Sequence, residues 1–183
     1  MIKHLCIEIT RAKNKWINHI IYELNSKEIK KVVDILKNGG IVIYPTDTVY
    51  GIGCDPFNKD SITRIFELKK RPLHNPLIVH IKSENELYKY VQNIPIKAKL
   101  LAKIFWPGPL TLVLPRTDLI PDYITANSKT VAIRVPDHPL TLELLSNLDY
   151  PLAAPSANPS NHVSSTTAQH VEKYFNTILP FVL

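Results

Sequence analysis

Hydrophobic residues recur with a helical period in the segment that begins at Ser26. Four apolar positions follow the i, i+3, i+4, i+7 spacing of one helix face: Ile29, Val32, Val33 and Leu36. Ser26 suits the N-cap position, and the Gly39-Gly40 pair suits a left-handed end to the helix. The pattern therefore predicts a helix that starts at Ser26 and stops before the two glycines.

Short apolar runs alternate with helical patterns through the rest of the chain. The run at 41–44 is short enough for a buried strand. Further strands are predicted at 77–81, 110–114, 131–135 and 151–154. Further helices are predicted at 58–69, 84–91, 96–105, 139–147 and 166–175. Helices and strands mixed in a chain of 183 residues predict one α/β or α+β domain.

The beginning of the chain shows no clear period and carries most of the net charge. We interpret residues 1–25 as a basic leader ahead of a domain at 26–183. Residues 1–31 contain seven Lys or Arg and three Asp or Glu, which supplies +4 of the net charge of +6. Such a segment could contact RNA phosphates. The alternative is a solvated leader with no ligand.

Composition excludes several classes of protein. With 5 glycines, the chain has no glycine three residues after the Gly51-x-Gly53 pair and no Gly-x-x-x-x-Gly-Lys run. A dinucleotide fingerprint and a Walker loop are therefore excluded. No run of about 18 apolar residues is present, so we expect no membrane span. The two cysteines, Cys6 and Cys54, fit a reducing compartment, and we expect a cytoplasmic protein.

Polar groups follow the predicted strand at 41–44. The segment 44–51 (YPTDTVYG) places two threonines and an aspartate at the end of that strand, where ligand sites often lie. The alternative is a turn whose Thr and Asp side chains satisfy their own backbone.

Three cations stand where the predicted helix at 58–69 ends. The segment 68–77 (LKKRPLHNPL) contains two prolines that stiffen it and fix the directions of Lys69, Arg71 and Asn75. Rigid cations of this kind suit a phosphate, and a guanidinium can bind it in a bidentate way. The alternative is that the cations only complement the dipole at the helix C-terminus.

Small and polar residues alternate in the segment 153–160 (AAPSANPS). Its alanines let a ligand approach the backbone, while Ser156 and Asn158 offer a hydroxyl and an amide. The alternative is a proline-rich turn. Ser156 lacks the Gly-x-Ser-x-Gly surroundings of a hydrolase nucleophile, so we exclude that activity. The seven histidines are not closely spaced, and we expect no metal site.

Together, five runs resemble the YrdC-like threonylcarbamoyl-AMP synthases: GGIVIYPTDTVYGIGCD, FELKKRPLHNPLIVHI, FWPGPLTLVL, TVAIRVPDHP and PLAAPSANPSNHVS. The resemblance covers residues 26–175 in order. It implies an α/β (α+β) fold with a twisted mixed sheet and flanking helices around a basic cavity. It also implies a nucleotidyltransferase that converts L-threonine, bicarbonate and ATP into threonylcarbamoyl-AMP and pyrophosphate. That product serves the N6-threonylcarbamoylation of adenosine 37 in tRNA.

The resemblance implies a set of site residues as well. The family's Lys-x-Arg motif falls on Lys69 and Arg71, which would act in catalysis by neutralising the triphosphate and the leaving pyrophosphate. The implied ATP contacts are Lys69, Arg71, Asn75, Thr130, Ser156, Asn158 and Ser164. The implied threonine contacts are Thr48, His80, Arg134 and Ala154.

For His80 and Arg134, the resemblance changes the interpretation that residue type alone would give. A histidine within a strand is usually an ordinary core residue, and the resemblance makes His80 a ligand contact. Arg134 lies within a predicted strand, where a buried guanidinium needs a partner that a substrate carboxylate would supply. We expect no permanently bound cofactor, and we expect Mg²⁺ to arrive with the ATP.

The family's sequence pattern continues beyond the segment that this chain matches. Members usually continue into a glycine-rich turn, a further strand and an Arg-Pro-Gly segment, whereas this chain ends in ILPFVL. We therefore expect a domain without the usual C-terminal strands: a compact active variant, a truncated protein, or one part of a split gene. The alternative function is a non-catalytic module of the same fold that binds tRNA or double-stranded RNA. Downstream partners would be the proteins that transfer the threonylcarbamoyl group to tRNA.

Overall fold

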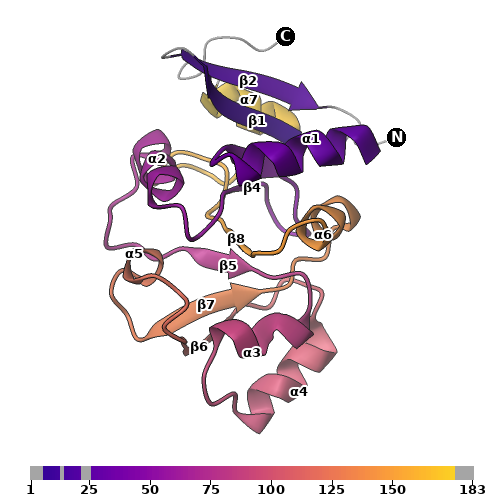
Figure 1. The fold of residues 1–183 in the computed structure, drawn as a ribbon, viewed down its shortest axis with the longest axis vertical. Helices are drawn as coiled ribbons and strands as arrows, with labels where there is room; N and C mark the ends of the chain where they lie inside the picture. Colours follow the sequence, from indigo (N-terminus) through magenta and orange to yellow (C-terminus); the bar gives the residue numbers. More distant parts are fainter. Residues whose placement is uncertain (1–5, 13–14, 22–25, 176–183) are drawn as a thin grey trace.

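The computed structural model describes residues 6–12, 15–21 and 26–175, which form two four-stranded sheets with helices around them (Figure 1). The strands are β1 (Cys6–Ala12), β2 (Lys15–Ile21), β3 (Ile41–Tyr44), β4 (Gly51–Gly53), β5 (Ile78–His80), β6 (Leu112–Pro115), β7 (Thr130–Arg134) and β8 (Leu152–Ala153). The helices are α1 (Ser26–Lys37), α2 (Lys59–Lys69), the 3-10 turn η1 (Glu84–Glu86), α3 (Leu87–Tyr90), α4 (Ile96–Phe105), α5 (Asp122–Thr125), α6 (Pro139–Ser146) and α7 (Ala168–Phe175).

The first sheet has the order β2-β1-β3-β4 and is antiparallel throughout. The edge strand β2 and its neighbour β1 come from the segment that we interpreted as a leader. β1 pairs with β3, so that Ile7, Glu8 and Ile9 lie opposite Ile43, Val42 and Ile41. The structure thus differs from the leader prediction, because residues of β1 and β2 extend the sheet of the domain. Backbone pairing with a distant strand supplies the order that the local pattern does not indicate.

The second sheet has the order β6-β7-β5-β8 and is mixed. β5 and β7 are parallel, and the register places His80 opposite Arg134 at their C-terminal ends. β6 and β8 run antiparallel to their neighbours. Single bridges, Cys54 to Ala153 and Gly51 to Ser156, join the edge of the first sheet to the segment around β8. The predicted mixed α/β fold is confirmed, although the strands are divided between two connected sheets.

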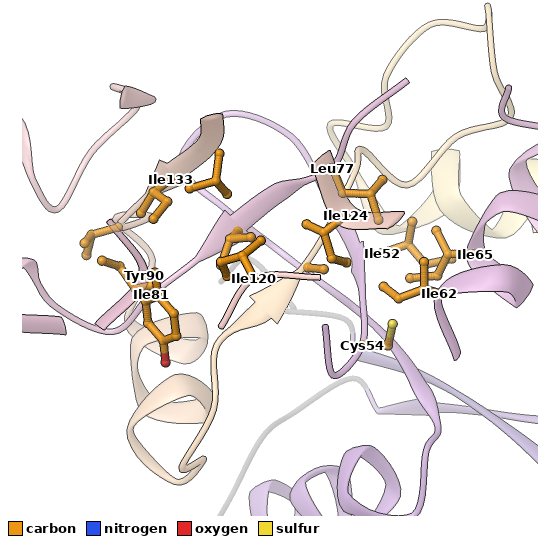
Figure 2. Close-up of a cluster of buried hydrophobic side chains, with 14 of the residues drawn as sticks. Ile52, Cys54, Ile62, Ile65, Leu77, Ile81, Tyr90, Ile120, Ile124 and Ile133 are labelled. Atoms are coloured by element: carbon orange, nitrogen blue, oxygen red, sulfur yellow. The ribbon is translucent and has the colours of Figure 1, made fainter. Parts of the chain in front are cut away.

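Strand β3 is buried on both faces, which explains its uninterrupted apolar sequence. Ile41 and Ile43 pack into the larger core cluster, whereas Val42 and Tyr44 pack against α1 and α6 in a second cluster. Alternate residues of a strand point to opposite faces, so one four-residue strand serves two cores. Figure 2 shows part of the larger cluster, where Ile62 and Ile65 of α2 lie near Ile52 of β4. These two cores hold the ends of β3, β5 and β7 in fixed positions.

Helix α2 lies where a helix is predicted at 58–69, with Asn58 as its N-cap instead of its first residue. The Asn58 side chain accepts a hydrogen bond from the Ser61 backbone N–H at 3.0 Å, which caps the N-terminus. Lys70 has a φ of 50°, and its N–H bonds back to the last turn. The helix therefore stops just before Arg71 and directs the chain toward β5.

The helix predicted from Ser26 to the residues before Gly39 is confirmed as α1. The predicted helices at 58–69, 96–105, 139–147 and 166–175 are confirmed as well, with bounds that shift by up to two residues. The segment 84–91 contains η1 and α3 instead of one helix. Two short elements, β4 and α5, were not predicted. No helix among the described residues is long and apolar enough to cross a membrane.

Candidate functional site

A cavity of about 250 Å³ opens beside the C-terminal ends of the parallel strands β5 and β7. Ligand sites in α/β folds often lie at this end of parallel strands. The loop after β3, the segment between α2 and β5, and the turn after β8 complete its walls. The lining residues are Thr46, Thr48, Val49, Tyr50, Gly51, Arg71, Pro76, Ile78, His80, Arg134, Ala154, Pro155 and Ser156.

Arg134 lies at the end of β7 with its guanidinium paired to an internal carboxylate. Its Nη2 donates to Asp47 Oδ1 at 2.5 Å, and the two side chains are only 9% and 17% exposed. Its Nε donates to the Gly108 carbonyl at 2.9 Å, and its Nη1 donates to Thr48 Oγ1 at 3.0 Å. We expected a substrate carboxylate to be the partner of Arg134. That expectation is incomplete, because Asp47 already compensates the charge.

Asp47 is itself held from two sides. Its Oδ1 also accepts a hydrogen bond from the Asp137 backbone N–H at 3.0 Å. The carboxylate therefore ties the loop after β3 to the segment after β7. Asp47 fixes where the guanidinium of Arg134 points in the cavity.

His80 lies opposite Arg134 in the sheet and is buried, with 4% of its surface exposed. Its Nδ1 is 2.9 Å from the Tyr44 hydroxyl. Burial and the nearby Arg134 cation lower the pKa of His80 to about 3, although Asp47 opposes that shift. His80 is therefore neutral at neutral pH and contributes a hydrogen-bonding group to the cavity rather than a positive charge.

The loop after β3 satisfies its own backbone and also faces the cavity. Thr46 Oγ1 donates to the Val49 carbonyl at 2.6 Å and accepts from the N–H groups of Thr48 and Val49. The Thr48 hydroxyl oxygen accepts from Arg134 Nη1 and lies 3.1 Å from Thr46 Oγ1. The bond from Arg134 uses one of the two lone pairs of this oxygen. Thr48 is left with acceptor capacity for a ligand.

Arg71 lies at the other side of the cavity without an acidic partner. Its Nε and Nη2 donate to the carbonyls of Asn75 at 3.3 Å and Pro76 at 2.9 Å. None of the ion pairs formed by the described residues includes Arg71. Burial lowers the pKa of Arg71, yet a guanidinium stays charged at neutral pH. Arg71 thus offers the cavity a positive charge that no carboxylate of the described residues neutralises.

Lys69 lies behind the cavity wall and does not line it. The residue is 1% exposed, and its Nζ donates to the Ser156 carbonyl at 2.5 Å and to the Asn158 carbonyl. The predicted proximity of the two segments is therefore correct, although they are 87 positions apart in sequence. The Lys69 ammonium contacts these backbone oxygens and does not face the cavity, where a ligand contact was expected.

The remaining predicted residues lie away from the cavity wall. Asn158 is buried, and its amide nitrogen donates to the carbonyls of Pro159 and His162. The Asn75 carbonyl supports Arg71, and the Thr130 hydroxyl lies 2.9 Å from Ser128 Oγ. Ser164 lines a second cavity of about 230 Å³ with Val163, His170, Lys173 and Tyr174. The ATP contacts assigned to these four residues stay predictions.

Sequence reasoning missed two side chains that organise the site, Tyr44 and Asp47. Tyr44 is the last residue of β3, and Asp47 lies in the polar loop after it, where the sequence indicated a possible ligand site but not an ion pair. Their partners lie far away in the sequence, at His80 and Arg134. The described residues contain no group of three or more His, Cys, Asp or Glu side chains that could hold a metal ion.

Comparison with known proteins gives consistent matches to one family. The model of the Sua5/YciO/YrdC family, described as telomere recombination, matches residues 34–183. The threonylcarbamoyl-AMP synthase of Pyrococcus abyssi is 45% identical over 148 residues, which are 81% of this chain and 44% of that protein. The threonylcarbamoyl-AMP synthase of an Enterobacter species is 37% identical and covers 88% of this chain and 85% of its own length.

The fold agrees with these matches. The crystal structure of P. abyssi Sua5 complexed with L-threonine superimposes with a TM-score of 0.82 and 43% identity, over 86% of this chain and 46% of that one. The chain thus spans less than half the length of the first curated relatives that it matches. The family match nevertheless extends over most of the sequence and over the strands that carry the cavity. The chain belongs to the Sua5/YciO/YrdC family.

Proposed function

We propose that this protein forms threonylcarbamoyl-AMP from L-threonine, bicarbonate and ATP, with release of pyrophosphate. Its curated relatives are named for this synthase activity, and the P. abyssi relative has been crystallised with L-threonine. The observation that carries the proposal is the cavity at β5 and β7, which combines an unneutralised Arg71 with the polar pair His80 and Arg134. The names of these relatives and the L-threonine complex support the synthase activity and not the alternative of a non-catalytic RNA-binding module.

The part of the cavity lined by Arg134 and Thr48 suits an amino acid. Three of the five N–H groups of Arg134 have the protein partners described above, which leaves N–H groups for a carboxylate. Thr48 has acceptor capacity for an ammonium or a hydroxyl group. Ala154 and Gly51 have little or no side chain, so a small ligand can approach the backbone there.

The part of the cavity lined by Arg71 and Ser156 suits a triphosphate. Arg71 supplies a charge there, and Ser156 supplies a hydroxyl from the turn after β8. A guanidinium binds phosphate oxygens in a bidentate way, which positions the chain of phosphates as well as neutralising it. Mg²⁺ would arrive with the ATP, because Mg²⁺ is commonly held by substrate phosphates.

The reaction follows from bringing these groups together. Bicarbonate takes up a proton and loses water to give CO₂. The threonine amine attacks the carbon of this CO₂ and loses a proton to solvent, which forms a carbamate. A carbamate oxygen then attacks the α-phosphorus of ATP, a new P–O bond forms, and the bond to the leaving pyrophosphate breaks. Both steps bring anions together, so the protein contributes position and positive charge. Arg71 would stabilise the charge that develops on the pyrophosphate.

Threonine-dependent release of pyrophosphate tests the proposal directly. We expect the intact protein to release pyrophosphate only when threonine, bicarbonate and ATP are all present. Arg71→Ala should lower the rate on the order of 10²-fold, as removal of a charged transition-state contact does. Lys103→Ala is the matched control, because it removes a cation from α4, outside the cavity. No threonine-dependent release by the intact protein would contradict the proposal. A tRNA partner, downstream transfer proteins and a cytoplasmic location stay predictions.

A further inference from the structure

Lys69 is the most deeply buried cation among the described residues that surround the cavity. Its side chain ends on two backbone oxygens of one turn, those of Ser156 and Asn158. Its own carbonyl accepts a hydrogen bond from the Ser160 N–H at 2.7 Å. Both ends of the residue therefore bind the segment 156–160.

We propose that Lys69 is a positioning residue, which holds the turn at 156–158 in place and acts on the ligand through that turn rather than by contact with the triphosphate. The inference rests on the proposed function, because the ligand that the turn receives is the ATP and threonine named above. It assigns different tasks to the two cations of the Lys-x-Arg motif. Arg71 faces the ligand, and Lys69 fixes the wall.

The turn needs such a clamp because two of its carbonyl oxygens point at the same place. The Ser156 and Asn158 oxygens both lie within hydrogen-bond distance of one ammonium group. Two buried carbonyl dipoles that converge in this way repel each other unless a donor lies between them. An ammonium has three N–H donors and can satisfy both oxygens at once.

The turn is also anchored to the first sheet, which makes its position important for the cavity. The Ala157 N–H donates to the Tyr50 carbonyl at 2.7 Å, and the Ile52 N–H donates to the Pro155 carbonyl at 2.9 Å. Pro155 and Ser156 line the cavity. A shift of the turn would therefore move one wall of the site relative to Arg71.

Two of the three N–H groups of the Lys69 ammonium are used by the carbonyls of Ser156 and Asn158. Lys69 is 1% exposed and is not among the residues that line the cavity, so a ligand in the cavity meets Ser156 rather than Lys69. Loss of the ammonium would leave the two carbonyls without this donor, which costs free energy. None of the ion pairs formed by the described residues includes Lys69, so the carbonyls are its electrostatic partners. Burial and the neighbouring Arg71 lower the pKa of Lys69 to about 8, so the ammonium is protonated at neutral pH.

The salt dependence of ATP binding separates a clamp from a phosphate contact. We would titrate ATP by calorimetry into wild type, Lys69→Met, Arg71→Met and Lys70→Met between about 50 and 400 mM salt, because screening weakens exposed charge contacts. Arg71→Met should weaken binding and flatten its salt dependence. Lys69→Met should weaken binding on the order of 10-fold while the salt dependence stays that of wild type. Lys70→Met is the matched control, since Lys70 is exposed and adjacent. A salt dependence flattened by Lys69→Met as much as by Arg71→Met would overturn the inference.

Hydrogen exchange provides a second measurement that needs no ligand. In Lys69→Met, the amides of Ala157 and Ser160 should exchange on the order of 10-fold faster than in wild type, because their turn has lost its clamp. In Lys70→Met they should exchange at the wild-type rate. Unchanged exchange in Lys69→Met would overturn the inference even if ATP binds. Conversely, a wild type that binds no ATP refutes the proposed function, while faster exchange would still support the clamp.

A chemical measurement on the wild type remains available if Lys69→Met does not fold. Acetylation with an amine-reactive reagent should modify the exposed Lys70 on the order of 10-fold faster than Lys69, which is 1% exposed. Addition of ATP should leave the labelling of Lys69 unchanged. Labelling of Lys69 as fast as that of Lys70, with protection by ATP, would show that its ammonium reaches the ligand.

Discussion

Replacing Asp47 by asparagine should destabilise the protein, because the change leaves Arg134 charged and buried without its carboxylate. The two side chains meet at 2.5 Å and are 9% and 17% exposed. Unit charges about 4 Å apart attract by about 4 kcal/mol at an effective dielectric constant of about 20. Removing one partner of a buried pair costs about 3–5 kcal/mol. Arg134 keeps its bonds to Gly108 and Thr48, so we expect a loss of about 2–4 kcal/mol in the free energy of unfolding.

Urea unfolding followed by circular dichroism measures this loss. Asp137→Asn is the matched control, since Asp137 is exposed and contacts Asp47 through its backbone N–H. The control should change the free energy of unfolding by less than about 0.5 kcal/mol.

A double-mutant cycle isolates the pair itself. Asp47→Asn should cost less in an Arg134→Met background, because no buried cation is then left unpaired. If Asp47→Asn costs less than about 1 kcal/mol, or costs the same in both backgrounds, the reasoning about a compensated buried charge is refuted.

Three further outcomes follow from buried groups near the site. The pKa of His80 is lowered from 6.5 to about 3, so the protein takes up a proton when it unfolds below pH 6.5. The free energy of unfolding of wild type should therefore fall by about 3 kcal/mol between about pH 6.5 and 4.5, relative to His80→Gln, in urea unfolding. The pKa of Lys69 is lowered from 10.5 to about 8, so the unfolded chain binds more protons than the folded one between about pH 8 and 10.5. The free energy of unfolding should therefore rise by up to about 3 kcal/mol across this pH range. Lys69→Met should not show the rise. A Cβ on Gly53 would lie 2.8 Å from the Tyr44 ring, so Gly53→Ala should lower stability by about 1–3 kcal/mol in thermal unfolding, and an unchanged midpoint would contradict this packing.

The fold class and most elements could be predicted from the sequence because the signals are local. The hydrophobic period of α1, the glycine pair that follows it and the apolar run of β3 each lie within a few residues of the element that they specify. The pairing of β1 with β3 could not be predicted in this way. It joins residues more than thirty positions apart, and the local pattern of residues 1–24 indicated no element.

The sequence by itself determined which residue types gather around the site: a cation pair at the end of α2, polar groups after β3, and small residues at and after β8. Only the tertiary structure decided what each side chain touches. Lys69 is directed to the carbonyls of Ser156 and Asn158, and Arg134 to Asp47. A residue's charge is a property of its type, whereas its partner depends on which distant segments the packing brings within hydrogen-bond distance. The same cation can therefore bind a ligand or hold a wall, and the three-dimensional arrangement selects between them.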